Sequence, residues 1–156
     1  MALSPLNDKY VALLAEEGNG AIETVLPDQE PLLVVLIGPI KTWWGRLDSV
    51  EYAEYSTWRD AVRVATIQAG HLVYSPHRAW QGAWHENAQI VNDAAILQSH
   101  AVIVLSPPDT VSVGTKAELV VAYENNKHVL FAPPADTSSL LTLIENLEAI
   151  RADKKN

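Results

Sequence analysis

The sequence contains no cysteine among its 156 residues. The chain therefore has no disulfides, no thiolate metal ligands and no cysteine nucleophile. Long hydrophobic runs are also missing: the longest apolar stretch, 32–40, is interrupted by Gly38 and Pro39 and is much shorter than the ~20 residues of a membrane-spanning helix. The N-terminus lacks the basic patch and apolar block of a signal peptide. We therefore expect a cytoplasmic protein without a membrane partner.

Basic residues are scarce, with 11 Lys and Arg against 19 Asp and Glu and a formal net charge of −8. A nucleic-acid backbone needs a clustered basic surface, so nucleic acid is not an expected partner. A small anionic ligand is compatible with this charge, because a local nest of backbone N–H groups binds phosphate even on an acidic protein. Hydrophobic residues make up 48% of the chain, which is enough to exclude wholesale disorder.

The chain divides into one domain with two flanking segments. Residues 1–30 are expected to form an N-terminal extension, in which Leu6 to Glu17 is a short amphipathic helix ended by Gly18 to Gly20. Residues 31–151 are long enough for one α/β domain with a sizeable core. Residues 152–156 are rich in charged side chains and are expected to form a frayed C-terminal tail.

Apolar runs of strand length alternate with segments of helical periodicity. Strands are expected at 32–37, 71–74, 101–105 and 128–131, and helices at 55–69, 84–99, 114–126 and 137–150. This order predicts a Rossmann- or flavodoxin-like α/β fold, a doubly wound sheet of four or five mainly parallel strands with helices on both faces. Ligands of such folds bind beyond the carboxyl ends of the strands, near the switch in strand order.

The loop after the first strand begins with Gly38, which permits close approach of a ligand to the backbone, and continues with Ile40 and Lys41. Trp43 and Trp44 follow. Two adjacent tryptophans either cover a planar ligand or a subunit contact, or cap the core. Both interpretations stand.

The loop after the second strand concentrates cations, aromatics and hydrogen-bonding groups, among them His77, Arg78 and Trp80. A connector does not need this density of functional groups, so ligand binding is favoured over a surface loop with inward-packed tryptophans. A zinc site is not expected, because His77 and His85 lack a compact third ligand. No metal and no cofactor are predicted.

The loop after the third strand leads through Ser112 and Gly114 into a helix, an arrangement typical of anion binding. It lacks the spacing of a P-loop. Glu118 lies near the start of that helix, where it either faces the strand ends or complements the helix dipole. Asp93, in the preceding helix, is either a second active carboxylate or a surface residue.

These segments together resemble the nucleoside 2-deoxyribosyltransferase superfamily. The resemblance covers roughly 32–131 and rests on Gly38-Pro39-Ile40, on Asn92-Asp93 with the run 94–105, on the segment 112–118 and on the segment 122–130. The transferases usually carry an aspartate six residues before the catalytic glutamate. Ser112 at that position resembles the nucleoside 5′-monophosphate N-glycosidases, and Pro76-His77-Arg78 with Trp80 is similar to the branch that hydrolyses CMP or hydroxymethyl-CMP.

The resemblance implies hydrolysis of the N-glycosidic bond of a nucleoside 5′-monophosphate, with Glu118 as nucleophile and Asp93 as the residue that protonates or orients the base or the sugar. It implies a homodimer or higher homo-oligomer with a shared active site, in which Ser138 or Ser139 of a neighbouring subunit completes the phosphate site. Substrate-binding residues implied within one chain are Gly38, Ile40, Lys41, His77, Arg78, Trp80, Ser112 and Gly114.

Two positions depart from the pattern of the relatives. Val35 replaces a tyrosine that orients the glutamate in some of them. Lys41 stands where several carry arginine, so the planar guanidinium that binds phosphate through two hydrogen bonds is lost. Val35 in place of the tyrosine keeps a non-catalytic nucleotide-binding module as an alternative. Base exchange by a deoxyribosyltransferase is a second alternative, which Ser112 disfavours. The cytokinin-activating phosphoribohydrolases are a more distant relative, because 111–114 lacks their run of glycines.

Overall fold

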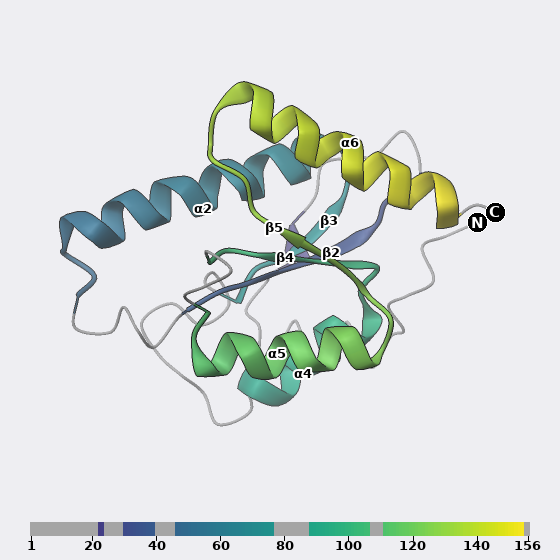
Figure 1. Cartoon of the computed structure of the whole chain (residues 1–156), viewed down its shortest axis with the longest axis horizontal. Helices are drawn as coiled ribbons and strands as arrows, with labels where there is room; N and C mark the ends of the chain where they lie inside the picture. Colours follow the sequence, from purple (N-terminus) through teal and green to yellow (C-terminus); the bar gives the residue numbers. More distant parts are fainter. Residues whose placement is uncertain (1–21, 24–29, 40–45, 77–87, 107–110, 155–156) are drawn as a thin grey trace.

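The computed structural model describes residues 22–23, 30–39, 46–76, 88–106 and 111–154, and within them a twisted sheet between two layers of helices (Figure 1). The strands are β1 (Ile22–Glu23), β2 (Leu33–Ile37), β3 (Leu72–Tyr74), β4 (Ala101–Val104) and β5 (His128–Phe131). Their order across the sheet is β1-β3-β2-β4-β5, and β2 to β5 are parallel. The predicted doubly wound α/β fold is confirmed.

The central strand carries the least polar sequence. All five residues of β2 are fully buried, since the strand has β3 on one side, β4 on the other and helices over both faces. The chain passes from β2 to β3 on one side and then crosses back over β2 to β4. This change of direction is the topological switch point, and it lies at the carboxyl ends of β2 and β4, which are followed by Gly38 and Leu105.

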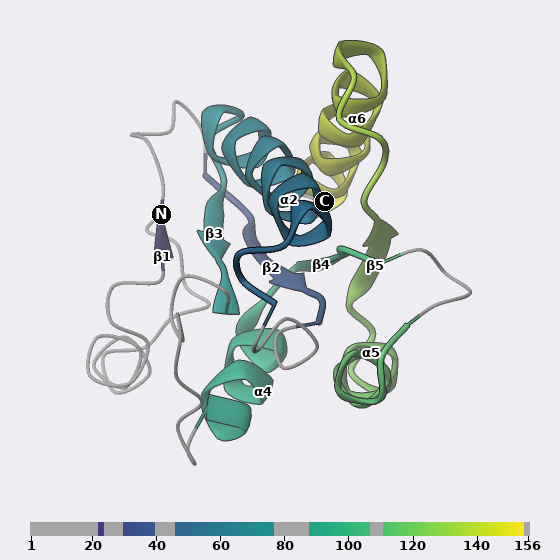
Figure 2. The same cartoon turned by 90° about the vertical axis from the view of Figure 1, so that its left-hand side faces the viewer.

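The helices form two layers (Figure 2). α2 (Val50–Gln68) and α6 (Thr137–Lys154) cover one face, and α4 (Ala88–Gln98) and α5 (Val113–Glu124) cover the other. Alternate strand residues enter the two cores: Leu36 and Ile103 pack towards α6, whereas Val35 and Val102 pack towards α4 and α5. Both faces of the sheet are therefore buried, as expected for a parallel sheet.

Several element bounds differ from those expected from the sequence. α2 begins at Val50 instead of Tyr55, because the Ser49 hydroxyl caps it by accepting a hydrogen bond from the backbone N–H of Tyr52 at 3.1 Å. α6 continues to Lys154 and so includes part of the expected tail. The segment before residue 31 contributes β1, which pairs antiparallel with β3 at one edge of the sheet.

At the amino end of the sheet, buried polar groups join α6 to the strands. The backbone N–H of Leu32 donates to Nδ1 of the fully buried His71 at 3.2 Å. The Arg151 guanidinium lies 3.1 Å from both ring nitrogens of His71 and donates to the carbonyl of Ala69 at 3.1 Å. Its other neighbour is the Glu148 carboxylate at 3.4 Å. This network anchors the C-terminal helix at the end of the sheet opposite the switch point.

None of the helices formed by the described residues is both long enough and apolar enough to cross a bilayer.

Candidate active site

Two carboxylates from different helices lie together between α4 and α5. Glu118 lies on the inner side of α5, and its side chain is buried. Asp93, half-buried on α4, is close enough to raise the pKa of Glu118 through its charge. The Gln89 amide, one turn before Asp93, donates to Asp93 Oδ1 at 2.8 Å and also hydrogen-bonds to Glu118. The two predicted catalytic residues are thus brought together.

The environment of Glu118 favours its protonated form. Burial is the main cause and the negative charge of Asp93 the second, and together they raise the pKa of Glu118 to about 8, although the hydrogen bond from Gln89 opposes the shift. Near neutral pH Glu118 therefore keeps its proton and is a carboxylic acid beside the negatively charged Asp93.

The start of α5 is built around Ser112. Its hydroxyl caps the helix by accepting from the Thr115 backbone N–H at 3.2 Å, and it donates to Thr115 Oγ1 at 2.9 Å. Gly114, one residue into the helix, is exposed, and a Cβ built on it would meet no atom within 4 Å. The first turn of α5 therefore borders open space at Gly114, with Glu118 one turn further along the helix.

Gly38, at the switch point, is required by close packing from the opposite face. A Cβ at this position would lie 2.6 Å from the Tyr55 hydroxyl oxygen of α2 and 3.2 Å from the Leu105 carbonyl oxygen. Burial raises the pKa of the Tyr55 hydroxyl above its usual range, so the group is neutral at physiological pH. Tyr55 therefore places a neutral hydroxyl against the end of β2.

Tyr74 lies beside Val35 in the sheet. Val35 of β2 pairs in register with Tyr74 of β3, and both side chains enter the core beneath α4 and α5. The Tyr74 hydroxyl donates to Asn92 Oδ1 at 2.6 Å, and both residues are buried. This bond fixes α4 against β3 directly beside Asp93.

The serines expected from a neighbouring subunit lie apart from Glu118 within one chain. Ser138 and Ser139 start α6, on the other face of the sheet (Figure 1). The backbone N–H and the hydroxyl of Ser139 donate to the Asp136 carboxylate at 2.8 and 2.9 Å. The remaining predicted binding residues lie outside the described residues: Ile40, Lys41, His77, Arg78 and Trp80, together with Trp43 and Trp44.

Gln89, Tyr55 and Tyr74 are residues of the site that the sequence patterns did not predict. Gln89 lies four residues before Asp93 in a predicted helix, and this spacing puts both side chains on one face. For Tyr55 and Tyr74 the sequence holds no comparable signal, because their contacts with Gly38 and Asn92 join segments separated along the chain.

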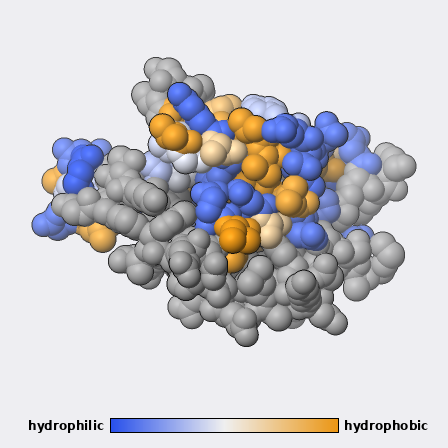
Figure 3. All heavy atoms as spheres, turned by 90° about the horizontal axis from the view of Figure 1, so that it is seen from below, coloured by the Kyte–Doolittle hydropathy of each residue, from blue (hydrophilic) through white to orange (hydrophobic). Residues whose placement is uncertain are grey.

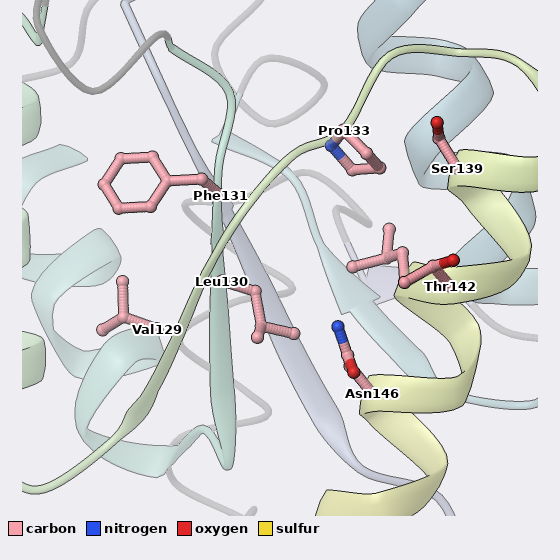
Figure 4. A pocket seen from close by; sticks show the side chains of 8 residues that line it. Val129, Leu130, Phe131, Pro133, Ser139, Thr142 and Asn146 are labelled. Atoms are coloured by element: carbon pink, nitrogen blue, oxygen red, sulfur yellow. The ribbon is translucent and has the colours of Figure 1, made fainter.

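A cavity of about 350 Å³ lies elsewhere, between β5 and α6 (Figure 4). Leu130 points from β5 towards α6, while Ser139, Thr142 and Asn146 follow the rim along α6. It belongs to the α6 face of the sheet and does not include the carboxylate pair. Within the described ranges no three His, Asp or Glu side chains are grouped as metal ligands.

Comparison with protein-family models, with curated proteins and with solved structures finds no match to this chain. Its function therefore has to be inferred from the chemistry of its own residues.

Proposed function

We propose that this protein hydrolyses the N-glycosidic bond of a nucleoside 5′-monophosphate, with a pyrimidine nucleotide such as CMP favoured, and releases the free base and a sugar 5-phosphate. The observation that carries the proposal is the pairing of the buried Glu118, whose pKa is raised, with the half-buried Asp93. Cleavage of such a bond needs a carboxylate to stabilise the sugar at C1′ and a proton for the departing base. A carboxyl pair that holds one proton supplies both.

The proton lies on Glu118 in the free protein, because Glu118 is the more deeply buried of the two. When the sugar binds and positive charge develops at C1′, the carboxylate form of Glu118 is favoured and the proton passes to Asp93. A Glu118 oxygen then bonds to C1′, the C1′–N bond breaks, and its electron pair leaves with the base, which takes the proton from Asp93.

The second half of the reaction regenerates the pair. Water attacks C1′ of the glycosyl-enzyme and gives its proton to Asp93. The bond from C1′ to Glu118 breaks, and Glu118 leaves as a carboxylate. The sugar 5-phosphate then dissociates, and the pair again holds one proton.

The start of α5 supports a nucleotide over a nucleoside as substrate. The N-terminal N–H groups of α5, capped by Ser112, favour an anion. The exposed Gly114 leaves room for a phosphate, and Glu118 lies on the same helix. A substrate whose phosphate binds at this terminus would present its sugar towards the carboxylate pair.

The test is release of free base from ribo- and deoxyribonucleoside 5′-monophosphates and from the corresponding nucleosides. We expect release from one or a few nucleotides and none from the nucleosides. Glu118→Gln should abolish release, and Asp93→Asn should reduce it by about 10²- to 10⁴-fold, the usual contribution of a general acid. Glu145→Gln, which replaces an exposed carboxylate on α6, serves as a control that leaves release unchanged.

Other outcomes identify the alternatives. If an added free base accepts the sugar in preference to water, the protein is a deoxyribosyltransferase that uses the same pair. If a nucleotide binds but no base is released under either condition, the protein is a binding module and the proposal of catalysis is wrong.

A further inference from the structure

A buried positive charge near the switch point has no part in the mechanism given above. The exposed hydrophobic side chains on the side of α4 and α5 lie scattered among hydrophilic ones (Figure 3), and such residues need no explanation of their own. Arg59 of α2 does need one, because the residue is only 6% exposed. A buried charge is costly unless an opposite charge compensates it.

Arg59 has no close and buried carboxylate among the residues that the structure describes. Its guanidinium donates to two neutral oxygens, the Ser56 hydroxyl at 3.1 Å and the Tyr52 hydroxyl at 3.5 Å. The carboxylate nearest to it is that of Asp60 at 3.7 Å, whose side chain is 46% exposed and also lies 3.5 Å from Arg63. The positive charge of Arg59 is therefore compensated only weakly.

The guanidinium lies at the level of the carboxyl end of the sheet. Tyr52 and Ser56 precede Arg59 by two turns and by one turn of α2, so its side chain extends towards the start of that helix. The central carbon of the guanidinium is 5.9 Å from the centre of the Tyr55 ring, and the Tyr55 hydroxyl lies against Gly38. α2 packs over β3 on this side of the sheet (Figure 2). The cation therefore lies beside the switch point, towards β3.

A second polar group at this end of the sheet is buried without a partner. Ser75 directly follows β3 and is fully buried, and its hydroxyl makes no hydrogen bond within the described ranges. Val73 packs towards α2 and α6, and Tyr74 packs towards α4 and α5. Because side chains alternate along a strand, Ser75 is on the α2 side, as Arg59 is. A weakly compensated cation and an unpartnered hydroxyl together indicate a place for a polar group of a ligand.

We propose that Arg59 binds the base of the substrate nucleotide, selects cytosine over uracil, and stabilises the negative charge of the departing base. This inference rests on the proposed function. The phosphate is placed at the start of α5, beyond β4, and the sugar at Glu118. The base is attached to the sugar away from the phosphate, so it extends past β2 towards β3, because the strand order is β3-β2-β4. Arg59 lies on that side.

The donors of Arg59 match the acceptors of cytosine. A guanidinium has five N–H groups, and the contacts with Ser56, Tyr52 and Asp60 leave one on each of the terminal nitrogens Nη1 and Nη2. Cytosine presents two adjacent acceptors, O2 and N3, which a guanidinium binds through two hydrogen bonds. Uracil carries a hydrogen on N3, so one of the two contacts is lost and two donors oppose each other.

The same contact acts on the bond that breaks. As the C1′–N1 bond cleaves, its electron pair passes to N1 and is shared with O2, to which Arg59 donates. Asp93 then gives its proton to N1, and neutral cytosine departs. A cation that is already in position where negative charge develops stabilises the transition state more than the bound substrate.

Arg59→Gln tests the selection, because a carboxamide presents one donor and one acceptor, the pattern that uracil matches. The native protein should release base from CMP at least about tenfold faster than from UMP, and Arg59→Gln should abolish or reverse this preference. Release from CMP should fall by about 10²- to 10³-fold, in kcat more than in KM. Arg63→Gln, one turn further along α2, is the matched control and should keep the native preference.

A nitrophenyl glycoside of ribose 5-phosphate separates this chemical role from a structural one. Nitrophenolate is stable as an anion and needs no guanidinium, so Arg59→Gln should cleave this substrate within about threefold of the native rate. Thermal melts show whether each variant is folded. Where Arg59→Gln is not, Arg59→Lys takes its place: it keeps the charge but offers a point donor, and it should lose most of the preference for CMP.

Three results would overturn the inference and leave the hydrolysis standing: a native preference for UMP or a purine nucleotide, an unchanged ratio of CMP to UMP in the Arg59 variants, or an equal loss of rate on CMP and on the nitrophenyl substrate. A native protein that releases base from no nucleotide contradicts the proposed function instead. Calorimetric titration with CMP and UMP then tests recognition alone. Arg59→Gln should weaken CMP binding by about tenfold or more and UMP binding less, whereas equal weakening, or no binding to the native protein, also contradicts the role of Arg59.

Discussion

Glu118→Gln should make the protein more stable, by an amount that grows with pH. In the folded protein the pKa of Glu118 is about 8, against an ordinary value of 4.5. Between these values the unfolded chain has lost the proton while the folded chain retains it. The free energy of unfolding of the native protein therefore falls as the pH rises through this window. The loss is complete above about pH 8.

The size of the effect follows from the shift. The difference between 8 and 4.5 is 3.5 pKa units, equivalent to about 5 kcal/mol. From pH 5 to pH 9 the native protein should lose about 4 kcal/mol of this amount, a large fraction of the roughly 5–15 kcal/mol that stabilises a typical domain. Glutamine keeps the shape of the protonated acid and does not titrate, so the variant escapes this loss.

Urea denaturation at several pH values between 5 and 9 measures the free energy of unfolding of both proteins. The advantage of Glu118→Gln should increase by about 4 kcal/mol across this range. Glu145→Gln removes an exposed carboxylate and should differ from the native protein by a small, nearly constant amount. A stability difference between Glu118→Gln and the native protein that does not change with pH would refute this account of the buried Glu118.

Three further substitutions test the surroundings of the pair. Asp93→Asn should lower the pKa of Glu118 from about 8, yet leave it above 4.5 because burial is the main cause of the shift. Carbon NMR titration of the Glu118 carboxyl measures this pKa. An unchanged pKa would contradict the electrostatic coupling to Asp93. Gly38→Ala should destabilise the protein by about 1–3 kcal/mol, because the new Cβ falls 2.6 Å from the Tyr55 hydroxyl oxygen. Denaturation curves should show a smaller cost in a Tyr55→Phe background, and an equal cost there would place the clash elsewhere. Tyr74→Phe removes the 2.6 Å hydrogen bond to Asn92 and should cost about 1–3 kcal/mol of unfolding free energy, whereas a neutral result would show that this bond does not hold α4.

The sequence predicted the architecture because hydrophobic patterning determines it locally. The run that became β2 is apolar throughout, as a central strand covered on both faces must be. The first and last residues of the helices were less predictable where a capping residue or tertiary packing determines them. Ser49 starts α2 one and a half turns before its apolar periodicity begins, and Arg151 holds the end of α6 against His71. β1 has two residues and carries no periodic signal.

Within the site, the sequence identified residues but not their contacts. Glu118 and Asp93 were recognised as candidate residues, but their electrostatic coupling exists only because α4 and α5 pack side by side. The same holds for Tyr55, which reaches Gly38 from the opposite face of the sheet. Contacts between segments far apart in sequence depend on tertiary packing, and neither periodicity nor motif spacing predicts them.

The most direct test of the central claim is to look for the glycosyl-enzyme. The native protein is mixed with each nucleotide that gives free base, quenched in acid during turnover, and digested for mass spectrometry. We predict an added sugar phosphate on the peptide that contains Glu118, and no addition in Glu118→Gln. Absence of base release from every nucleotide, or an adduct on another residue, would contradict the assignment of Glu118 as the nucleophile.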